Sequence, residues 1–421
     1  MFGFFDVFMK QSILFTKTSK TTPKDETSFN AQTLIRAGFI DKVGAGIYTF
    51  LPLGLRVLNK INNIIREEIN AVGGQEVLMP ALTPKSVWET TDRWANFDAL
   101  FKLTGSDEKE YALGATHEEI VTPLAQRFCT SYKNLPFAVY QIQTKFRNEK
   151  RAKAGLIRGR EFLMKDLYSF HVSQEDLDSY YEKVKEAYFK IYSRLGLGDI
   201  THITYASGGA FSKYSHEFQT VTNAGEDLIY VCKKCKVAIN KEIIEEQTNC
   251  PECGSSDLEE KKAVEVGNIF KLGTKFSKPF NFNYSDKDGK TQDVIMGCYG
   301  IGPSRILGTI VEIYNDEKGM IWPKSVAPFS IHLVSFKQNE EAEKIYKELV
   351  SAGFEVLYDD REDSSLGEKL NDADLIGCPY RLIVSQKNIN LNQIEIKKRS
   401  EKEPVMVDKN DLLNFLKSYV K

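Results

Sequence analysis

The sequence predicts an α+β protein in which an antiparallel hairpin anchors a large first region and a smaller mixed α/β domain follows. The length of 421 residues exceeds what one ordinary core holds, which predicts two or three domains. Apolar and polar residues alternate over 139–146, and a second run over 161–170 predicts an antiparallel partner strand. Strand and helix patterns then alternate from residue 330 to residue 419, as in a separate mixed-sheet domain.

Composition narrows the class of protein. A net charge of −2 means that any nucleic-acid contact must come from local basic patches. No apolar run approaches the ~20 residues that a membrane helix needs, and the start, MFGFFDVFMK, lacks the basic stretch of a signal peptide. We therefore expect a cytoplasmic enzyme that does not contact membranes.

The predicted hairpin carries the most informative side chains. Arg147, Glu149 and Phe162 fall near its base on neighbouring strands. A guanidinium suits a phosphate, a carboxylate suits an amino group or a metal ion, and an aromatic ring suits a purine. The loop beyond is basic and suits a nucleic-acid backbone; it contains Lys150, Arg151, Lys153, Arg158 and Arg160. The alternative is a solvated charged hairpin, which is the more common role of a charge run.

The first part of the chain predicts an irregular arm over 1–30 and a glycine-rich apolar segment over 31–54. Apolar residues then recur at helical spacing over 57–72, and Gly73-Gly74 ends this helix. A short strand over 76–79 stops at Pro80. A second amphipathic helix is predicted over 171–195, with Ser173 as its N-cap.

Two short segments offer polar groups at the edge of a site. Residues 111–122 predict a strand that runs into a helix, where Thr116 and Glu118 offer a hydroxyl and a carboxylate. These two residues fit a helix cap, and they also fit capture of a substrate ammonium or imino group. His216, in the tetrapeptide SHEF, fits a pocket lip, although a single histidine is more often structural.

Four of the seven cysteines form two C-x-x-C pairs, which predicts a reducing compartment and a metal. Their spacing predicts a tetrahedral, structural zinc site in a short excursion over 227–262; the four are Cys232, Cys235, Cys250 and Cys253. The alternative is a set of free thiols.

Residues 297–308, GCYGIGPSRILG, predict a glycine-rich turn and then a helix from about Pro303 with Arg305 in its first turn. Small residues let a backbone approach a ligand, and Arg305 faces whatever lies at the helix start. Neither a Walker nor a Rossmann motif occurs, so a bound nucleotide would be held in another way.

The C-terminal domain begins near residue 326. Its predicted strands are 330–336, 354–359, 380–385 and 393–398, and its predicted helices are 339–352, 365–376 and 408–419. The full organisation is an arm over 1–30, a large domain over 31–325 and the C-terminal domain over 326–421.

Three motifs in this order resemble the signatures of class II aminoacyl-tRNA synthetases: the helix and strand ending at Pro80, FRNE…RGREF at 146–162, and GIGPSR at 300–305. GATHEE, SHEF, MGCYGIG and the run from Asp359 to Pro379 make the chain similar to the bacterial-type prolyl-tRNA synthetases. The resemblance covers nearly the whole chain from about Lys17 onward.

That resemblance implies an antiparallel catalytic sheet of six to seven strands, an anticodon-binding C-terminal domain, and a homodimer formed through the first signature. ATP with Mg²⁺ would be held by Arg147, Glu149, Arg158, Gly159, Phe162, Ser304 and Arg305, with Arg147 and Arg305 as the catalytic pair. Proline would be held by Thr116, Glu118, Arg147 and His216. tRNA(Pro) would meet Lys150, Arg151 and Lys153 at its acceptor end and the C-terminal domain, with Asp360, Arg361 and Lys369, at its anticodon.

The resemblance also implies the reaction: the carboxylate of L-proline attacks the α-phosphorus of ATP, pyrophosphate leaves, and the prolyl group passes to the tRNA 3′ end. One feature departs from many bacterial relatives, because only the short cysteine-bearing excursion stands where a large editing domain often lies. We therefore expect no editing in cis. The rival interpretations are a threonyl or seryl sister enzyme, a paralogue that has lost catalysis, and a zinc-ribbon nucleic-acid binder.

Overall fold

The computed structural model describes residues 8–150, 152–209, 211 and 214–419, and the chain divides into two compact units. The smaller unit comprises Met1–Lys42, Thr49–Lys60 and Ile310–Lys421, and the larger comprises Val43–Tyr48 and Ile61–Thr309. Helices α2 (Pro52–Ala71) and α7 (Pro303–Ile313) and the hairpin of β2 (Ile40–Gly44) and β3 (Ile47–Phe50) cross the division. The domain limits expected from the sequence (1–30, 31–325 and 326–421) differ from this division and stay a prediction.

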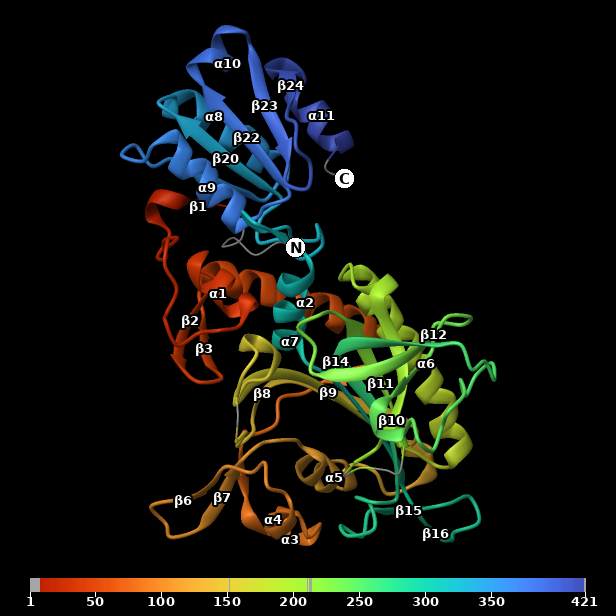
Figure 1. The fold of residues 1–421 in the computed structure, drawn as a ribbon. Helices are drawn as coiled ribbons and strands as arrows, with labels where there is room; N and C mark the ends of the chain where they lie inside the picture. Colours follow the sequence, from red (N-terminus) through yellow and green to blue (C-terminus); the bar gives the residue numbers. More distant parts are fainter. Residues whose placement is uncertain (1–7, 151, 210, 212–213, 420–421) are drawn as a thin grey trace. The chain divides into compact units, whose positions relative to one another are not determined.

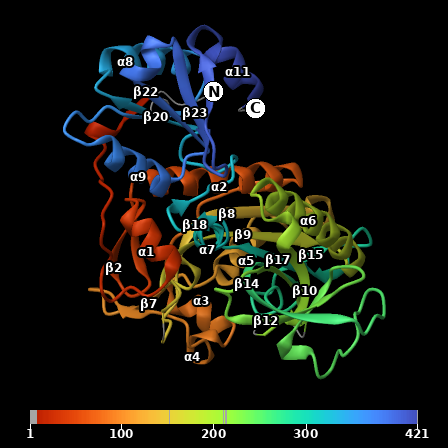
Figure 2. The same ribbon diagram turned by 45° about the horizontal axis from the view of Figure 1, so that its top comes forward.

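A nine-stranded sheet forms the centre of the larger unit, and Figures 1 and 2 show it in two views. Its strands, in spatial order, are β11 (Tyr214–Val221), β10 (Thr201–Ser207), β13 (Ala238–Asn240), β12 (Asp227–Cys232), β14 (Leu258–Gly273), β17 (Ile295–Ile301), β9 (Glu161–His171), β8 (Phe137–Phe146) and β4 (Gly74–Glu76). Most neighbours are antiparallel, whereas β4–β8 and β10–β13 are parallel. The predicted antiparallel architecture is confirmed, with more strands than expected.

The predicted hairpin is confirmed as β8 and β9, which pair antiparallel from Phe137 opposite Phe170 to Phe146 opposite Glu161. Helix α6 (Gln174–Arg194) follows and covers one face of β9, β14 and β17. The Ser173 hydroxyl caps this helix by accepting a hydrogen bond from the Asp176 amide at 3.2 Å. The predicted start at residue 171 was wrong, because the strand continues through His171.

The first long helix, α2, forms because its apolar residues recur on one face, and these are buried: Val57, Leu58, Ile61, Ile64, Ile65 and Ile69. Gly73 follows with a φ of 84°, a left-handed conformation that favours glycine after a helix. The predicted strand over 76–79 was shifted, since regular pairing covers only Gly74–Glu76 and Val77 adds a single bond to the Tyr140 carbonyl.

Smaller elements complete the larger unit. They are the three-stranded sheet of β5 (Leu82–Pro84), β6 (Lys102–Thr104) and β7 (Glu110–Leu113), the helices α3 (Lys85–Thr90), α4 (Arg93–Asn96) and α5 (Glu118–Gln126), and the hairpin of β15 (Asn283–Ser285) and β16 (Thr291–Asp293). The predicted strand-to-helix change over 111–122 is confirmed by β7 and α5.

The cysteine-bearing excursion, which the sequence predicts only as a short metal-binding segment, is part of the main sheet. Strand β12 pairs with β14 over six residues, and β13 lies between β12 and β10. All three residues of β13 are buried. The excursion therefore uses the core of the sheet instead of building one of its own.

The glycine-rich segment before Pro303 was expected to be a turn and is instead a strand, β17, between β14 and β9. Its glycines allow close packing: a Cβ at Gly297 would lie 2.4 Å from the Tyr299 hydroxyl oxygen and 2.8 Å from Ser169 Oγ. The helix predicted from Pro303 is confirmed as α7.

The smaller unit contains a mixed sheet, as predicted for the C-terminal domain, but with six strands where four were predicted. Its order is β1 (Phe8–Lys10), β21 (Val356–Asp359), β20 (Ile331–Phe336), β22 (Tyr380–Ser385), β23 (Gln393–Lys398) and β24 (Val405–Asp408). The pairings from β1 to β22 are parallel, and the pairings β22–β23 and β23–β24 are antiparallel. The sequence prediction missed β1 and β24. Its helices are α1 (Phe29–Arg36), α8 (Asn339–Ser351), α9 (Leu366–Ile376), α10 (Gln386–Asn390) and α11 (Leu412–Tyr419), with a short ribbon of β18 (Asn315–Asp316) and β19 (Gly319–Met320).

Two expectations for this unit were wrong. The last helix begins at Leu412 instead of Asp408, because Asp408 ends β24. The N-terminal arm is not irregular throughout, since β1 pairs with β21 and a 3₁₀ turn covers Gln11–Ile13 before an irregular segment over 14–28. The arm adds a bond of 3.0 Å between Gln11 Oε1 and His332 Nε2, and the Ser12 hydroxyl donates to Asp360 at 2.8 Å. Among the described residues, no helix has the length and apolar character needed to cross a membrane.

Candidate active site

A cavity of about 160 Å³ in the larger unit brings together residues that lie far apart in the sequence. Five predicted site residues line it: Thr116, Glu118, Arg147, Phe162 and Arg305. The first two stand at the start of α5, Arg147 follows β8, Phe162 lies in β9, and Arg305 lies in the first turn of α7. The cavity thus combines two cations, a carboxylate, a hydroxyl and an aromatic ring.

Arg147 presents its guanidinium to this cavity. Its backbone amide donates to the Arg160 carbonyl at 2.8 Å, which closes the base of the hairpin. The guanidinium carbon lies 5.3 Å from the centroid of the Phe162 ring. Burial, and next the nearby Arg305, lowers the pKa of Arg147, and its Nε has no hydrogen-bond partner among the described residues. A half-buried arginine that lines a cavity and has an unused donor is suited to an anionic ligand.

Arg305 is held more firmly from both sides. Its Nε donates to the Ile157 carbonyl at 2.8 Å, and its Nη1 donates to the Glu265 carboxylate at 3.0 Å. Helix α7 points its N-terminus at the cavity, so the backbone dipole and two guanidinium groups make this end of the cavity positive. A polyphosphate would be stabilised there.

Glu118 supplies the negative end of the cavity and is completely buried. The Thr116 hydroxyl donates to its carboxylate, and the Cys298 thiol donates to Oε1 at 3.2 Å. His117 is the N-cap residue of α5, and no side chain makes a capping hydrogen bond there. Thr116 and Glu118 therefore do not cap this helix. Arg93 lies 3.5 Å from Glu118 and 2.9 Å from Glu119.

Arg93 pairs mainly with Glu119, which is the closer of the two carboxylates. Burial raises the pKa of Glu119 to about 7, against the opposing effect of Arg93. The Arg93 guanidinium is enclosed by the rings of Trp88, Phe97, Phe211 and Phe276, with centroids 4.3 to 5.7 Å away. Glu118 is left with capacity to accept a hydrogen bond from a ligand cation.

Sequence reasoning missed the floor of the cavity. Asp166 lies there and is paired with the buried Lys145 at 2.8 Å, while Gln141 and Tyr168 donate to its other oxygen at 3.0 and 2.9 Å. Burial lowers the pKa of Lys145. The alternation of side chains along β8 and β9 could have indicated Lys145 and Asp166, because polar residues on the inner face of a central strand have to be paired.

A small adjoining cavity contains the remaining hairpin residues predicted to contact a nucleotide. Glu149, Arg158 and Gly159 line it together with Arg147, Phe162 and Arg305. Arg158 donates from Nε to Glu149 Oε2 at 3.1 Å. Ser304 lines neither cavity; its hydroxyl accepts a bond from the Leu163 amide at 3.2 Å and joins the start of α7 to β9.

The basic loop borders a wide cavity of about 570 Å³, where Lys150, Lys153 and Arg158 face Glu226 and Asp98. Lys153 lies 2.9 Å from Glu226, and Arg158 lies 3.2 Å from it. The predicted contact residue Arg151 lies outside the described residues.

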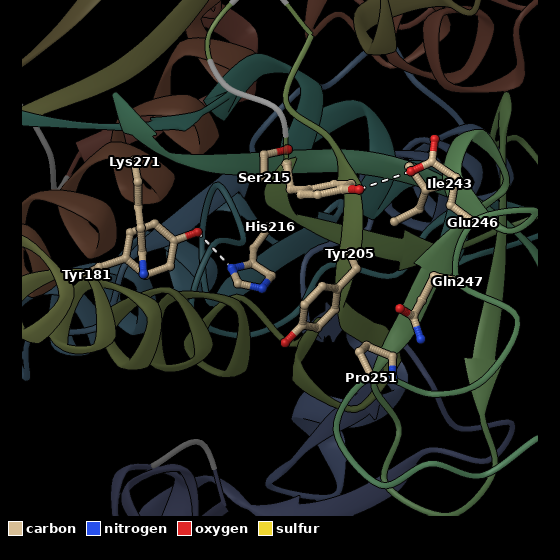
Figure 3. Close-up of a pocket in the computed structure, with 10 residues that line it drawn as sticks. Tyr181, Tyr205, Ser215, His216, Ile243, Glu246, Gln247, Pro251 and Lys271 are labelled. Atoms are coloured by element: carbon tan, nitrogen blue, oxygen red, sulfur yellow. Dashed lines mark hydrogen bonds between the residues drawn. The ribbon is translucent and has the colours of Figure 1, made fainter. Parts of the chain in front are cut away.

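His216 is not brought together with Thr116 and Glu118. It lines a different cavity of about 380 Å³, and Figure 3 shows it between Tyr181 and Tyr205. The Tyr181 hydroxyl lies 2.7 Å from His216 Nδ1. Burial lowers the pKa of His216 to about 4, so the ring is neutral near pH 7. Because side chains alternate along β11, His216 and Phe218 face α6, whereas Glu217 faces the opposite side.

Two of the three residues singled out in the C-terminal domain, Arg361 and Lys369, belong to an internal charge cluster. Arg361 donates to Asp359 at 2.7 Å and to Asp372 at 2.9 Å. Lys369 is 2% exposed and donates to the Ser335 carbonyl at 2.7 Å, so it stabilises this unit from within. Asp360 accepts bonds from Ser12.

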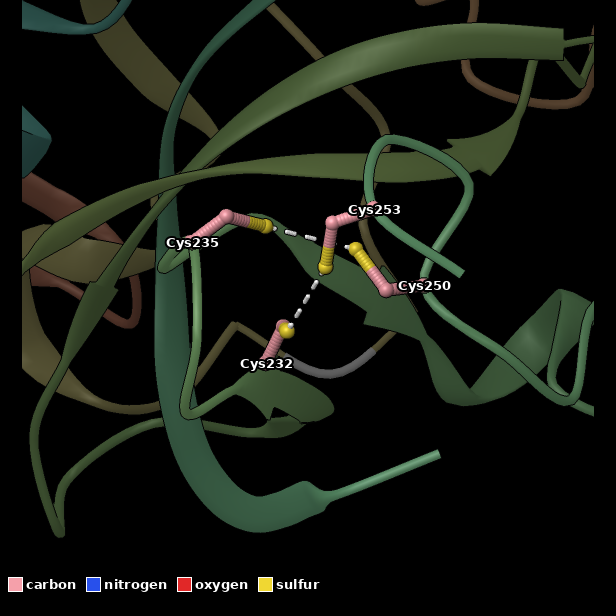
Figure 4. A group of neighbouring side chains, drawn as sticks. All are labelled: Cys232, Cys235, Cys250 and Cys253. Carbon is pink, nitrogen blue, oxygen red and sulfur yellow. Dashed lines mark hydrogen bonds between the residues drawn. The ribbon is translucent and has the colours of Figure 1, made fainter. Parts of the chain in front are cut away.

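The four cysteines of the excursion converge, as Figure 4 shows. Their sulfur atoms all lie within 4.8 Å of one another. The pairs Cys232–Cys253 and Cys235–Cys250 are 3.6 and 3.4 Å apart, well beyond the ~2.05 Å of a disulfide. Tetrahedral zinc–thiolate bonds of about 2.3 Å require sulfur separations of about 3.8 Å, so the four residues fit a zinc ion.

Comparison with known families identifies the general class of protein. Residues 101–314 match the tRNA synthetase class II core domain (G, H, P, S and T), and residues 325–419 match the anticodon binding domain. The Wolbachia pipientis proline–tRNA ligase is 40% identical, covering 94% of this chain and 96% of that protein. The Ehrlichia chaffeensis enzyme of the same name is 38% identical over 97% of this chain and all of its own length. The chain belongs to the prolyl-tRNA synthetase family.

A structural comparison agrees on the fold. A Giardia lamblia prolyl-tRNA synthetase in complex with prolyl-adenylate aligns with a TM-score of 0.75 at 22% identity, covering 90% of this chain and 73% of that one. The Moorella thermoacetica proline–tRNA ligase, 33% identical, aligns over 551 positions, many more than the 421 residues of this chain. That relative therefore contains segments that have no counterpart here.

Proposed function

We propose that the chain attaches L-proline to tRNA(Pro) in two steps, activation by ATP to prolyl-adenylate and transfer to the tRNA 3′ end. The observation that carries the proposal is the single cavity that joins Arg147, Arg305 and Phe162 to Thr116 and Glu118. One end suits the phosphates and base of ATP, and the other suits the cationic nitrogen of an amino acid.

The residue roles follow from the charges in the cavity. Arg147 would neutralise the α-phosphate and the attacking carboxylate, Arg305 the departing pyrophosphate, and Phe162 would stack on adenine. Glu118, supported by Thr116, would accept the hydrogen bonds of the proline nitrogen. Glu149 and the Arg158-Gly159 pair would contact the nucleotide, while Ser304 would act by holding α7 against β9.

The chain needs no nucleophile of its own for this reaction. The carboxylate oxygen of proline attacks the α-phosphorus in line, and the bond to the bridging oxygen of pyrophosphate breaks. Both arginines are present before the charge develops, so catalysis comes from positioning and electrostatic stabilisation. Mg²⁺ bound to ATP would neutralise part of the phosphate charge when present.

The proposal is tested by exchange of labelled pyrophosphate into ATP with each of the twenty amino acids. We expect exchange that depends on proline. Faster exchange with threonine or serine would assign the chain to a sister enzyme, and no exchange with any amino acid would indicate a non-catalytic relative.

tRNA would bind through the basic loop and the C-terminal domain. Lys150, Arg151 and Lys153 would contact the acceptor stem, whereas the buried Lys369 and the paired Arg361 would maintain the anticodon-binding domain. The protein would act in the cytoplasm as a homodimer through α2 and the segment that ends at Pro80.

We further propose that the chain does not edit mischarged alanyl-tRNA in cis. A pocket shaped for proline rejects the smaller alanine by only a modest factor, which makes separate hydrolysis useful. Between β9 and α7 the described chain builds helix α6, strands of the main sheet with the cysteine excursion, and the short β15–β16 hairpin. Purified protein is expected to leave alanyl-tRNA(Pro) at the rate of spontaneous hydrolysis, measured by release of labelled alanine; faster release at low enzyme concentration would contradict this.

The four cysteines are proposed to hold a structural zinc ion. Their four sulfur atoms all lie within 4.8 Å of one another, which suits the four thiolates of one tetrahedral ion. Cys253→Ser is expected to remove one bound zinc per chain and lower the melting temperature, measured by metal analysis and calorimetry. Cys129→Ser, the same change at a buried cysteine outside the cluster, is the control. A metal-free wild-type protein would contradict the proposal.

A further inference from the structure

Strand β13 carries one polar side chain into the interior, that of Asn240. Register places Asn240 opposite Ile229 of β12, and the same strand pairs in parallel with β10 through Ala238 and Ile239. The Asn240 side chain is on the same sheet face as Glu217, because Ala238 pairs with Thr204 and Thr204 pairs with Glu217. The excursion thus reaches the side of the sheet opposite α6.

Both ends of the Asn240 amide are used. Its Oδ1 accepts from the Glu242 amide at 3.1 Å and caps a short 3₁₀ turn, Lys241–Ile243. Its Nδ2 donates to Glu217 Oε2 at 2.9 Å, and the residue is 5% exposed. The cap determines which end of the amide faces the carboxylate, so Asn240 is an obligatory donor to Glu217.

Glu217 is surrounded by amide donors and by other carboxylates. Gln219 donates to the same Oε2 at 2.9 Å, and Asn268 approaches Oε1 at 3.5 Å. Burial raises the pKa of Glu217 to about 8, and the nearby carboxylates of Glu265 and Asp227 act in the same direction. The hydrogen bonds from Gln219 and Asn240 lower this pKa. Each donor therefore favours the ionised carboxylate.

A continuous chain of hydrogen bonds runs from Glu217 to the cavity. Asn268 Nδ2 donates to Glu265 Oε1 at 3.0 Å, and Arg305 Nη1 donates to Glu265 Oε2 at 3.0 Å. Asn268, Glu265 and Arg305 all line the cavity that contains Arg147. One end of this network is the cysteine excursion, and the other end is the arginine assigned to pyrophosphate.

We propose that Asn240 is a positioning residue: it fixes the Glu217 carboxylate and, through Asn268 and Glu265, the orientation of Arg305 in the nucleotide half of the site. This inference rests on the proposed function. It gives the excursion a role in ATP use in addition to its place in the sheet. The proline half, around Thr116 and Glu118, is not part of this network.

Substitutions separate the donor from the cap. Asn240→Asp keeps an oxygen for the Glu242 amide, removes the donor and places a second carboxylate against Glu217. Asn240→Ser also keeps a capping oxygen and removes the donor without adding charge. Asn249→Asp makes the same chemical change at an exposed position of the same excursion and is the matched control.

The experiment is steady-state pyrophosphate exchange on the full-length protein, with ATP and proline varied separately. Loss of a hydrogen bond that leaves a buried acceptor without its donor predicts a fall of roughly 10-fold in kcat/KM for ATP, larger for Asn240→Asp than for Asn240→Ser. The KM for proline and the behaviour of Asn249→Asp are expected to match the wild type. A purely structural role would reduce the active fraction and leave both KM values unchanged.

Unchanged kcat/KM for ATP in both Asn240 variants, or equal losses for ATP and proline, would overturn the inference. If Asn240→Asp does not fold, Asn240→Ser decides the question alone. A wild-type protein that exchanges pyrophosphate with no amino acid would refute the proposed function itself, which is distinct from a normal wild type with unaffected variants.

Discussion

Arg147→Ala is expected to reduce proline-dependent pyrophosphate exchange by about 1,000-fold, the loss typical of removing a preorganised group that stabilises transition-state charge. Arg147 is half-buried, stands against Phe162, and has a buried Nε without a partner among the described residues. Its guanidinium is therefore available to a ligand and contributes little hydrogen bonding to the fold. The measurement is initial-rate exchange at saturating ATP and proline.

Arg147→Lys is the informative companion, because it keeps the charge and loses the planar pair of donors. We expect partial activity, between that of the wild type and that of the alanine variant. The melting temperature should change little in either variant. Wild-type exchange in Arg147→Ala would remove this residue from the site.

Glu118→Gln is expected to raise the KM for proline by roughly 100-fold, because an unpaired cation buried in the site costs about 3 kcal/mol or more. Glu118 is fully buried, and its neighbours Thr116 and Cys298 donate to it, so it is oriented before the substrate arrives. The KM for ATP should stay within a few-fold of the wild type, since the phosphate end of the cavity is unaltered.

Glu108→Gln, at an exposed turn position, is the matched control and should leave both KM values unchanged. If Glu118→Gln instead raises the KM for ATP and leaves that for proline unchanged, the two ends of the cavity have been assigned in reverse. Loss of folding in Glu118→Gln would be visible as a lower melting temperature.

Local pattern was sufficient to predict the elements whose neighbours lie close in the sequence. The β8–β9 hairpin, α6 with its Ser173 cap, and the alternating strands and helices of the C-terminal domain were predicted within a few residues. Pairings across long sequence distances were not, because periodicity does not identify partners. Strand β1 joining β21 and strand β13 entering between β10 and β12 belong to this group.

The cavity shows the same division. Motifs identified Thr116, Glu118, Arg147, Phe162 and Arg305, and the structure places them around one cavity. Within the tetrapeptide 215–218, the sequence predicted a site role for His216 and none for its neighbour Glu217. Strand alternation with the apolar Phe218 indicates that His216 faces α6 and that Glu217 faces the other side. The network of Asn240, Asn268 and Glu265 depends on the fold and has no local signature.

The most direct test of the central claim is aminoacylation of a tRNA(Pro) transcript by the purified full-length protein with ATP and labelled L-proline. Formation of prolyl-tRNA that requires ATP and is lost in Arg147→Ala is the predicted result. A protein that binds the transcript and leaves it uncharged with proline, or charges it with a different amino acid, would contradict the account.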